Sequence, residues 1–243
     1  ILLEEADLIL SILVPAQAEG VAQSVADAMR DLGIGKPFAD CNAVSPETSK
    51  RLESIINSAG GDYVDAGIIG GSPARGAEPR FYTSGPHSSI MDELDGQGIA
   101  IRNVGGEAGR ASSVKMCYAS FTKGTSALQV AMMTAAQSLG IYEELAAELS
   151  SSQPENLSRM EGNVPSLPSN AGRWIGEMEE IAATFDSVGV TPHFHLGAAE
   201  IFRLLESTPF ALESPETVDR SRTLADTIKV VAEYLPADLE SAD

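Results

Sequence analysis

The sequence predicts an α/β domain followed by an all-helical domain. Up to about residue 109, short apolar runs with the character of strands alternate with segments of helical spacing. After Gly109 these runs stop, and a helical stretch from Arg110 to about Leu139 opens a series of further helices. Repeated strand–helix–strand units are typical of a mainly parallel sheet that is covered on both faces. We therefore expect two domains, residues 1–109 and residues 110–243.

Each element of the first half has a local signal. The run from Asp62 to Ile69 is apolar and lies between Gly60-Gly61 and Gly70-Gly71, as expected for a buried strand. Ser45 followed by Pro46 is typical of a helix start, because serine caps the first amides and proline fits the first turn. Similar signals predict strands at 7–14, 36–41, 62–69, 80–84 and 98–104, and helices at 19–32, 45–58 and 86–95.

The second half has only helical signals. The stretch from Arg110 carries apolar side chains at intervals that predict one buried face, and Gly140 ends it. Prolines separate the later helical segments. On the long helix we expect burial of Val114, Tyr118, Phe121, Leu128 and Met132. Further helices are expected at 141–151, 155–162, 169–188, 193–206 and 215–235.

The charge balance excludes several classes of function. The 243 residues include 35 acids and 16 bases, for a formal net charge of −19. Binding to nucleic acid or to an anionic membrane requires basic patches, so we expect neither. The longest apolar run, Leu8 to Pro15, is far too short to span a bilayer. Cys41, Cys117 and three histidines form no metal-binding spacing, and so few cysteines favour a reducing cytoplasm.

The first residues of the sequence have the pattern of a helix end followed by a buried strand. Residues 1–6 have the character of the last turns of a helix, and residues 7–14 have that of a buried strand. A fold rarely begins with a helix end that leads into a central strand. We therefore expect that a further N-terminal segment precedes Ile1 in the whole protein.

Lysine is scarce in this sequence, and Lys115 is the unusual one. It follows the glycine-rich segment 105–110 and lies in the first turns of the long predicted helix, at the junction of the two predicted domains. Domain junctions are favoured ligand sites. The positive end of a helix macrodipole also favours a lowered lysine pKa, which suits proton transfer. A solvated lysine near a helix start is the alternative that the pattern leaves open.

Two predicted strands end in segments that could approach a ligand. The strand at 62–69 leads into Gly70 and Gly71, and ligands of open α/β sheets bind at such strand ends. The strand at 36–41 leads through Asn42 to a helix start, which favours anions. An ordinary tight turn at the first segment, and simple capping by Ser45 at the second, are the alternatives.

The order of these clusters resembles that of the β-hydroxyacid dehydrogenases, which include 3-hydroxyisobutyrate dehydrogenase and phosphogluconate dehydrogenase. The resemblance covers essentially the whole chain. The helical half, with Gly197-Ala198-Ala199-Glu200-Ile201-Phe202, is similar to the phosphogluconate dehydrogenase-like branch that has its own C-terminal domain. The matching segments of the first half are Leu13-Val14-Pro15, Asp40-x-Asn42-x-x-Ser45-Pro46, Asp65-Ala66-x-x-x-Gly70-Gly71 and Gly106-x-x-Gly109-x-x-x-x-x-Lys115.

The resemblance implies an NAD- or NADP-dependent oxidoreductase that acts on a small-molecule substrate. It also implies a Rossmann-type domain followed by a helical domain that forms a homodimer. Lys115 matches the family's catalytic lysine, its general acid/base. The implied substrate-binding residues are Asn42, Ile69, Gly70 and Gly71. The implied cofactor-binding residues, which line the nicotinamide half, are Leu13, Val14, Pro15, Asn42 and Ala43.

The sequence departs from the family pattern in several places. The G-x-G-x-x-G fingerprint is missing, so we expect the preceding segment to hold roughly 60–80 residues, about two strand–helix units. Ile69 replaces the usual serine before the loop glycines, and Ala119 replaces an asparagine. These losses allow a second hypothesis, a non-catalytic dimeric scaffold with a decayed redox site. Under the first hypothesis, they favour a bulkier and less polar substrate than a small hydroxy acid.

Overall fold

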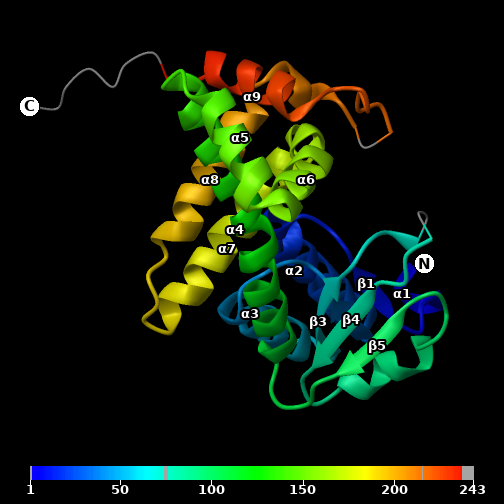
Figure 1. The fold of residues 1–243 in the computed structure, drawn as a ribbon. Coiled ribbons are helices and arrows are strands. Elements are labelled where there is room, and N and C mark those ends of the chain that lie inside the picture. Colours follow the sequence, from blue (N-terminus) through cyan, green and yellow to red (C-terminus); the bar gives the residue numbers. More distant parts are fainter. Residues whose placement is uncertain (1, 74–75, 215, 237–243) are drawn as a thin grey trace, which may run out of the picture. The chain divides into compact units, whose positions relative to one another are not determined.

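A computed structural model of the chain describes residues 2–73, 76–214 and 216–236 (Figure 1). These residues form two compact units. Unit 1 comprises the residues up to Ala119 together with Glu180–Pro192, and unit 2 comprises Ser120–Glu179 and the residues from His193 onward. The boundary therefore falls inside the long helix α4 (Arg110–Ser138) rather than before it. The first turns of α4 belong to unit 1 because they are hydrogen-bonded to its sheet.

Unit 1 is built on a five-stranded sheet, which confirms the predicted α/β class. The strand order is β1-β2-β3-β4-β5, and the neighbours are parallel except for β3 and β4, which are antiparallel. The predicted, mainly parallel sheet did not include this reversal, although the length of the connection explains it. Only ten residues, 70–79, join β3 to β4, and a parallel connection needs a longer crossover. The strands are β1 (Ile9–Ser11), β2 (Pro37–Asp40), β3 (Asp62–Ile69), β4 (Arg80–Ser84) and β5 (Ala100–Asn103).

Helices cover both faces of this sheet. On one face, α2 (Pro15–Leu32) and α3 (Pro46–Asn57) form a core with Phe38 and Tyr63. On the other face, Met91 of the 3₁₀ helix η2 (Ser88–Leu94) packs with a second core. Ser45 caps α3 as predicted, since its hydroxyl accepts the Thr48 N–H at 3.2 Å. A short helix, α1 (Leu2–Glu5), precedes β1.

Unit 2 is helical, as predicted. One expected helix, 215–235, begins only at Leu224, because Thr223 and Asp226 form a capping box there. The helices after α4 are α5 (Tyr142–Ser152), α6 (Pro154–Asn163), η3 (Val164–Ser166), α7 (Pro168–Ser187), α8 (His193–Glu206), η4 (Pro209–Leu212) and α9 (Leu224–Glu233). Within the described ranges, no helix combines the length and the apolarity that crossing a membrane requires.

The predicted buried face of α4 is wrong. Phe121 is 73% exposed, Leu128 69% and Tyr118 46%. The helix carries two apolar stripes on opposite sides, and periodicity alone cannot tell which of them faces a core. The stripe of smaller and more flexible side chains is the buried one, and it includes Met116, Ala119, Ala127, Val130 and Met133.

Candidate functional site

One buried carboxylate, that of Asp65 on β3, holds the start of α4. Its Oδ2 atom accepts the backbone N–H groups of Gly109 at 2.8 Å, Ala111 at 3.0 Å and Ser112 at 3.1 Å. The hydroxyls of Ser84 and Ser112 donate to the same carboxylate at 2.7 and 2.6 Å. The first amides of a helix have no partner within the helix, and a negative charge there is stabilising. Asp65 therefore fixes where α4 starts on the sheet.

Gly67 allows α4 to lie directly against β3. A Cβ atom on Gly67 would be 2.8 Å from the Cβ of Lys115 and 3.1 Å from the carbonyl oxygen of Ala111. Such distances are too short for any other residue without a shift of the helix. The half-buried Lys115 then reaches along the strand, and its Nζ donates to the carbonyl oxygen of Ile68 at 2.7 Å. The candidate catalytic lysine is thus anchored at the carboxyl end of β3.

The end of β3 and the loop after it carry three of the predicted substrate-binding residues. Ile69 is buried at 2% exposure, whereas Gly70 and Gly71 are exposed. Gly70 has a φ of +128°, and a Cβ there would be 3.2 Å from the Cα of Pro79. Its glycine is therefore required by the backbone turn that brings Pro79 back against the strand end.

A second polar cluster joins the ends of β1 and β2. The Asn42 side chain donates to Ser11 Oγ at 3.0 Å and to Asp40 Oδ1 at 2.5 Å, and its carbonyl oxygen accepts the Leu13 N–H. Asp40 is fully buried, and its Oδ2 has no hydrogen-bond partner among the described residues. Burial, with a smaller contribution from the charge of Asp65, raises the pKa of Asp40 to about 7.

The predicted cofactor-binding residues lie around this cluster. Leu13 and Val14 are 42% and 37% exposed at the carboxyl end of β1, and Pro15 begins α2. Asn42 is buried and Ala43 is half-buried. The structure brings Leu13 and Asn42 together, since they share a hydrogen bond, and it leaves apolar surface exposed beside them.

A row of polar residues connects the two clusters across one face of the sheet. The strand registers pair Ser11 with Asp40, Asp40 with Asp65, and Asp65 with Ser84. All four are buried. Neighbouring strands lie about 4.8 Å apart, so the cluster around Asn42 and the cluster around Asp65 are close neighbours. Asp65 belongs to a motif quoted from the sequence, but it had no predicted role, and Gly67 and Ser84 were not predicted at all. The Asp-x-Gly spacing near the end of the strand was the available signal.

Glu180 also supports the site. Its carboxylate accepts the Ser45 N–H at 2.6 Å and the Thr48 hydroxyl at 3.0 Å, which ties the end of α7 to the start of α3 within unit 1. Nothing in the sequence near Glu180 indicated this contact, because the partners are 132 and 135 residues apart. The described residues contain no cluster of histidine, cysteine, aspartate and glutamate that could hold a metal ion.

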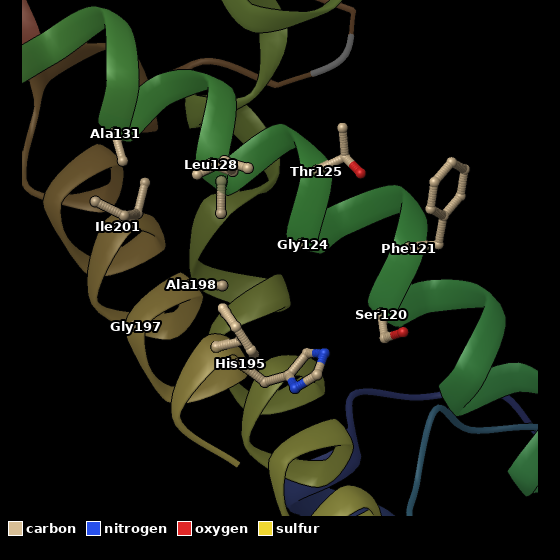
Figure 2. Close-up of a pocket in the computed structure, with 12 residues that line it drawn as sticks. Ser120, Phe121, Gly124, Thr125, Leu128, Ala131, His195, Gly197, Ala198 and Ile201 are labelled. Atoms are coloured by element: carbon tan, nitrogen blue, oxygen red, sulfur yellow. The ribbon is translucent and has the colours of Figure 1, made fainter. Parts of the chain in front are cut away.

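Unit 2 contains an apolar groove between α4 and α8. It encloses about 520 Å³, and none of its lining residues is an acid, a lysine or an arginine. In Figure 2 the His195 ring extends from α8 toward the part of α4 that carries Ser120. Burial lowers the pKa of His195. Leu128 and Phe121, whose burial was expected from the sequence, line this groove instead.

Unit 2 also contains an ion pair that sequence reasoning missed. Lys123 pairs with Glu177, and both side chains are largely buried, at 13% and 8% exposure. The Lys123 ammonium also lies 5.1 Å from the centre of the Trp174 ring. Lys123 is therefore a structural lysine of unit 2 rather than a solvated one.

The fold is that of an α/β protein of the dehydrogenase type. The family model "Domain of unknown function (DUF1932)" matches residues 136–205. The chain is 30% identical to the conserved protein MTH1747 of unknown function, whose structure is described as similar to 3-hydroxyacid dehydrogenases. That match covers 83% of this chain and 75% of the other, with a TM-score of 0.60. The chain belongs to this family, within the β-hydroxyacid dehydrogenase superfamily.

Other similar proteins agree with the fold. A conserved hypothetical protein from Sinorhizobium meliloti 1021 is 24% identical, with 95% and 76% of the two chains covered and a TM-score of 0.68. The 3-hydroxyisobutyrate dehydrogenase of Mycobacterium tuberculosis is 15% identical, with 93% and 79% covered and a TM-score of 0.58. An uncharacterized 28.5 kDa protein of Methanothermus fervidus is 26% identical over 144 residues, which are 59% of this chain and 53% of that protein. That match spans about half of the curated relative.

Proposed function

We propose that this chain is part of an NAD- or NADP-dependent oxidoreductase that interconverts a hydroxyl and a carbonyl carbon, with Lys115 as the acid/base. The observation that carries the proposal is the position of Lys115. Its Nζ is fixed 2.7 Å from the Ile68 carbonyl oxygen, at the strand end where open α/β sheets bind ligands. Gly67 and Asp65 hold it there, through the close approach and the buried hydrogen bonds described above.

The residues at the end of β1 fit a nicotinamide ring. Leu13 and Val14 expose apolar side chains that a flat, uncharged ring would cover. The Leu13 backbone is held by Asn42, so the apolar surface has a fixed position relative to the strand ends. When bound, a nicotinamide supplies or accepts the hydride. Within this chain, Leu13, Val14, Pro15 and Ala43 would hold the ring, and the buried Asn42 would keep them in place through its bond to the Leu13 N–H.

The chain's own residues move the proton. In the oxidation direction Lys115 takes the proton from the substrate hydroxyl oxygen, and in the reduction direction it returns a proton to the carbonyl oxygen. Gly70 and Gly71 leave the backbone after β3 open to the substrate, because they have no side chains. The buried side chain of Ile69 provides no hydrogen bond to a substrate.

The proposal is tested by replacing Lys115 with Met in the full-length protein. This change keeps most of the side-chain volume and removes the proton-transfer group. General acid/base groups contribute roughly 10²–10⁴-fold, so kcat should fall by about that factor while cofactor affinity changes little. The assay follows nicotinamide absorbance with a panel of hydroxy acids that includes bulky aromatic ones.

Lys50→Met is the matched control, because Lys50 is exposed on α3 of the same unit and its ion-pair partner within the described part of the chain is the exposed Glu47. Its kcat should stay within about twofold of the wild type, as expected for a surface substitution. Equal and small losses for the two variants would contradict the role of Lys115.

A non-catalytic dimeric scaffold is the second candidate. Two observations favour it: Ile69 is buried where the family has a serine, and Ala119 is buried where the family has an asparagine. The same assay separates the two candidates. A scaffold would show no nicotinamide-linked turnover with any member of the panel, with or without Lys115.

We also propose that the protein forms a homodimer through unit 2. The groove between α4 and α8 exposes Phe121, Leu128 and Phe194 but carries no acid. Two copies of a chain with a net charge of −19 can meet there without bringing carboxylates together. Uncharged apolar surface of this kind is typical of interfaces between subunits.

A further inference from the structure

One face of the sheet in unit 1 collects basic and phenolic side chains around Lys115. The registers place Tyr82 opposite Gly67 and Arg80 opposite Ile69. Residues directly opposite each other on antiparallel strands point to the same face. The missing Cβ of Gly67 points at Lys115, so this is the face that α4 approaches. Arg80 and Tyr82 therefore lie on the same face as Lys115.

Arg80 lies at the same end of the sheet as the Lys115 ammonium. Because β4 is antiparallel to β3, its first residue, Arg80, is paired with Ile69, the last residue of β3. The Lys115 Nζ is bonded to the carbonyl oxygen of the neighbouring Ile68. On the next strand, Arg102 is paired with Tyr82, which adds a second guanidinium to this face.

The charge of Arg80 is not neutralised within the described part of the chain. Arg30 and Arg51 pair with Asp27 and Glu19, whereas the half-buried Arg80 has no ion pair or hydrogen-bond partner among the described residues. Several exposed arginines also lack a carboxylate partner there, but Arg80 is half-buried, like Arg222, which pairs with Glu213. A planar guanidinium binds a carboxylate through two parallel hydrogen bonds.

We infer that Arg80 binds the carboxylate of the substrate and so determines its specificity. This inference rests on the proposed function, because it places the anion beside Lys115. Ile69 cannot hydrogen-bond an anionic group, and Arg80 stands directly opposite Ile69 on the neighbouring strand. The guanidinium thus supplies the polar contact that Ile69 lacks. Tyr82, one pair further along the strand, is a second donor on the same face.

A binding experiment tests the inference without requiring turnover. The full-length protein is titrated with butyrate and with butyramide, which has the same skeleton but no charge, while the Arg80 Nε–H and Gly70 amide signals are followed by NMR. Butyrate should shift both signals and butyramide should not. Charge-assisted bonds are the strong ones, so Arg80→Gln should weaken butyrate binding roughly 10–100-fold, and Arg80→Lys should weaken it less. Arg51→Gln, at an exposed position of α3, is the control and should leave binding unchanged.

Kinetics then separate this inference from the proposed function. For a hydroxy acid that the enzyme oxidises, Arg80→Gln should raise KM by a similar factor, whereas KM for its methyl ester should stay unchanged. Equal effects on acid and ester, or butyrate binding that survives Arg80→Gln, would overturn the role of Arg80 even if Lys115→Met abolishes turnover. Conversely, lost butyrate binding in Arg80→Gln together with an active Lys115→Met enzyme would refute the proposed acid/base and leave Arg80 as an anion-binding residue. Arg80→Lys keeps the charge, so partial retention of butyrate binding in this variant links the loss in Arg80→Gln to the removed charge.

Discussion

The substitution Asp65→Asn probes how the start of α4 is held on the sheet. Asparagine has nearly the shape of aspartate but no charge. With its carbonyl oxygen at the position of Oδ2, it can still accept the N–H groups of Gly109, Ala111 and Ser112. Its amide can face the Ser112 hydroxyl, which is able to turn and accept. The variant therefore removes the charge while it keeps most of the hydrogen-bond geometry.

The expected loss follows from these bonds. A hydrogen bond to a charged group contributes about 1.5–3 kcal/mol, and a neutral one about 0.5–1.5 kcal/mol. The three backbone bonds to Oδ2 should therefore each lose about 1 kcal/mol. Two effects oppose this loss, because a buried carboxylate is costly to desolvate and Asp65 repels the neighbouring Asp40. We expect the weakening of the three hydrogen bonds to outweigh these two effects, which gives a net loss of about 2 kcal/mol in the free energy of unfolding.

Urea unfolding followed by circular dichroism measures this loss, and hydrogen exchange reports it locally. The amides of Gly109, Ala111 and Ser112 should exchange faster in Asp65→Asn than in the wild type, because they open with the start of α4. Asp62→Asn is the matched control, because Asp62 lies at the other end of β3 and its side chain is half exposed. Among the described contacts, its ion-pair partner is the His87 ring at 3.5 Å. The control should change stability by less than about 0.5 kcal/mol. An Asp65→Asn protein as stable as the control, with unchanged exchange at the three amides, would refute the reasoning.

Two further predictions concern the other cluster and the groove. Asp40 binds a proton in the folded state up to a pH of about 7, whereas the carboxyl of the unfolded chain, at its ordinary pKa of 3.8, releases the proton at lower pH. Its contribution to stability is therefore fully present below about pH 4 and is lost as the pH rises toward 7. The difference corresponds to about 4 kcal/mol at 1.36 kcal/mol per unit, so Asp40→Asn should gain up to that amount on the wild type between pH 4 and pH 8 in urea unfolding. A stability difference that is constant with pH would contradict this assignment. For the groove, Leu128→Asp should shift the protein toward monomer in sedimentation at micromolar concentration, because it places a charge in an apolar contact. Leu212→Asp, which changes a 92% exposed leucine outside the groove, should leave the association unchanged; a wild type that is monomeric at this concentration would argue against the dimer.

The sequence by itself predicted the elements that depend on neighbouring residues. The bounds of β3, the Ser45 cap of α3 and the extent of α4 match their predictions closely, because a cap, a glycine boundary or a helical repeat acts over a few residues. The position of Lys115 in the first turns of a helix, just after the glycine-rich segment 105–110, was also readable, since both signals lie within one segment. Where such a signal was weak, as before Leu224, the predicted boundary was off by about nine residues, 215 against 224.

The tertiary structure decided everything that depends on strand register and on which face of a helix is covered. The short connection 70–79 favours an antiparallel β4, but only the register of the sheet places Arg80 opposite Ile69. The buried and exposed stripes of α4 are both apolar, so only packing shows that Phe121 and Leu128 remain exposed. The hydrogen bonds of Asp65 to residues 44 to 47 positions away, and the approach of Lys115 to Gly67, arise because the sheet brings distant segments within contact distance. A single sequence does not encode such distances locally, because they result from the joint packing of all the elements around them.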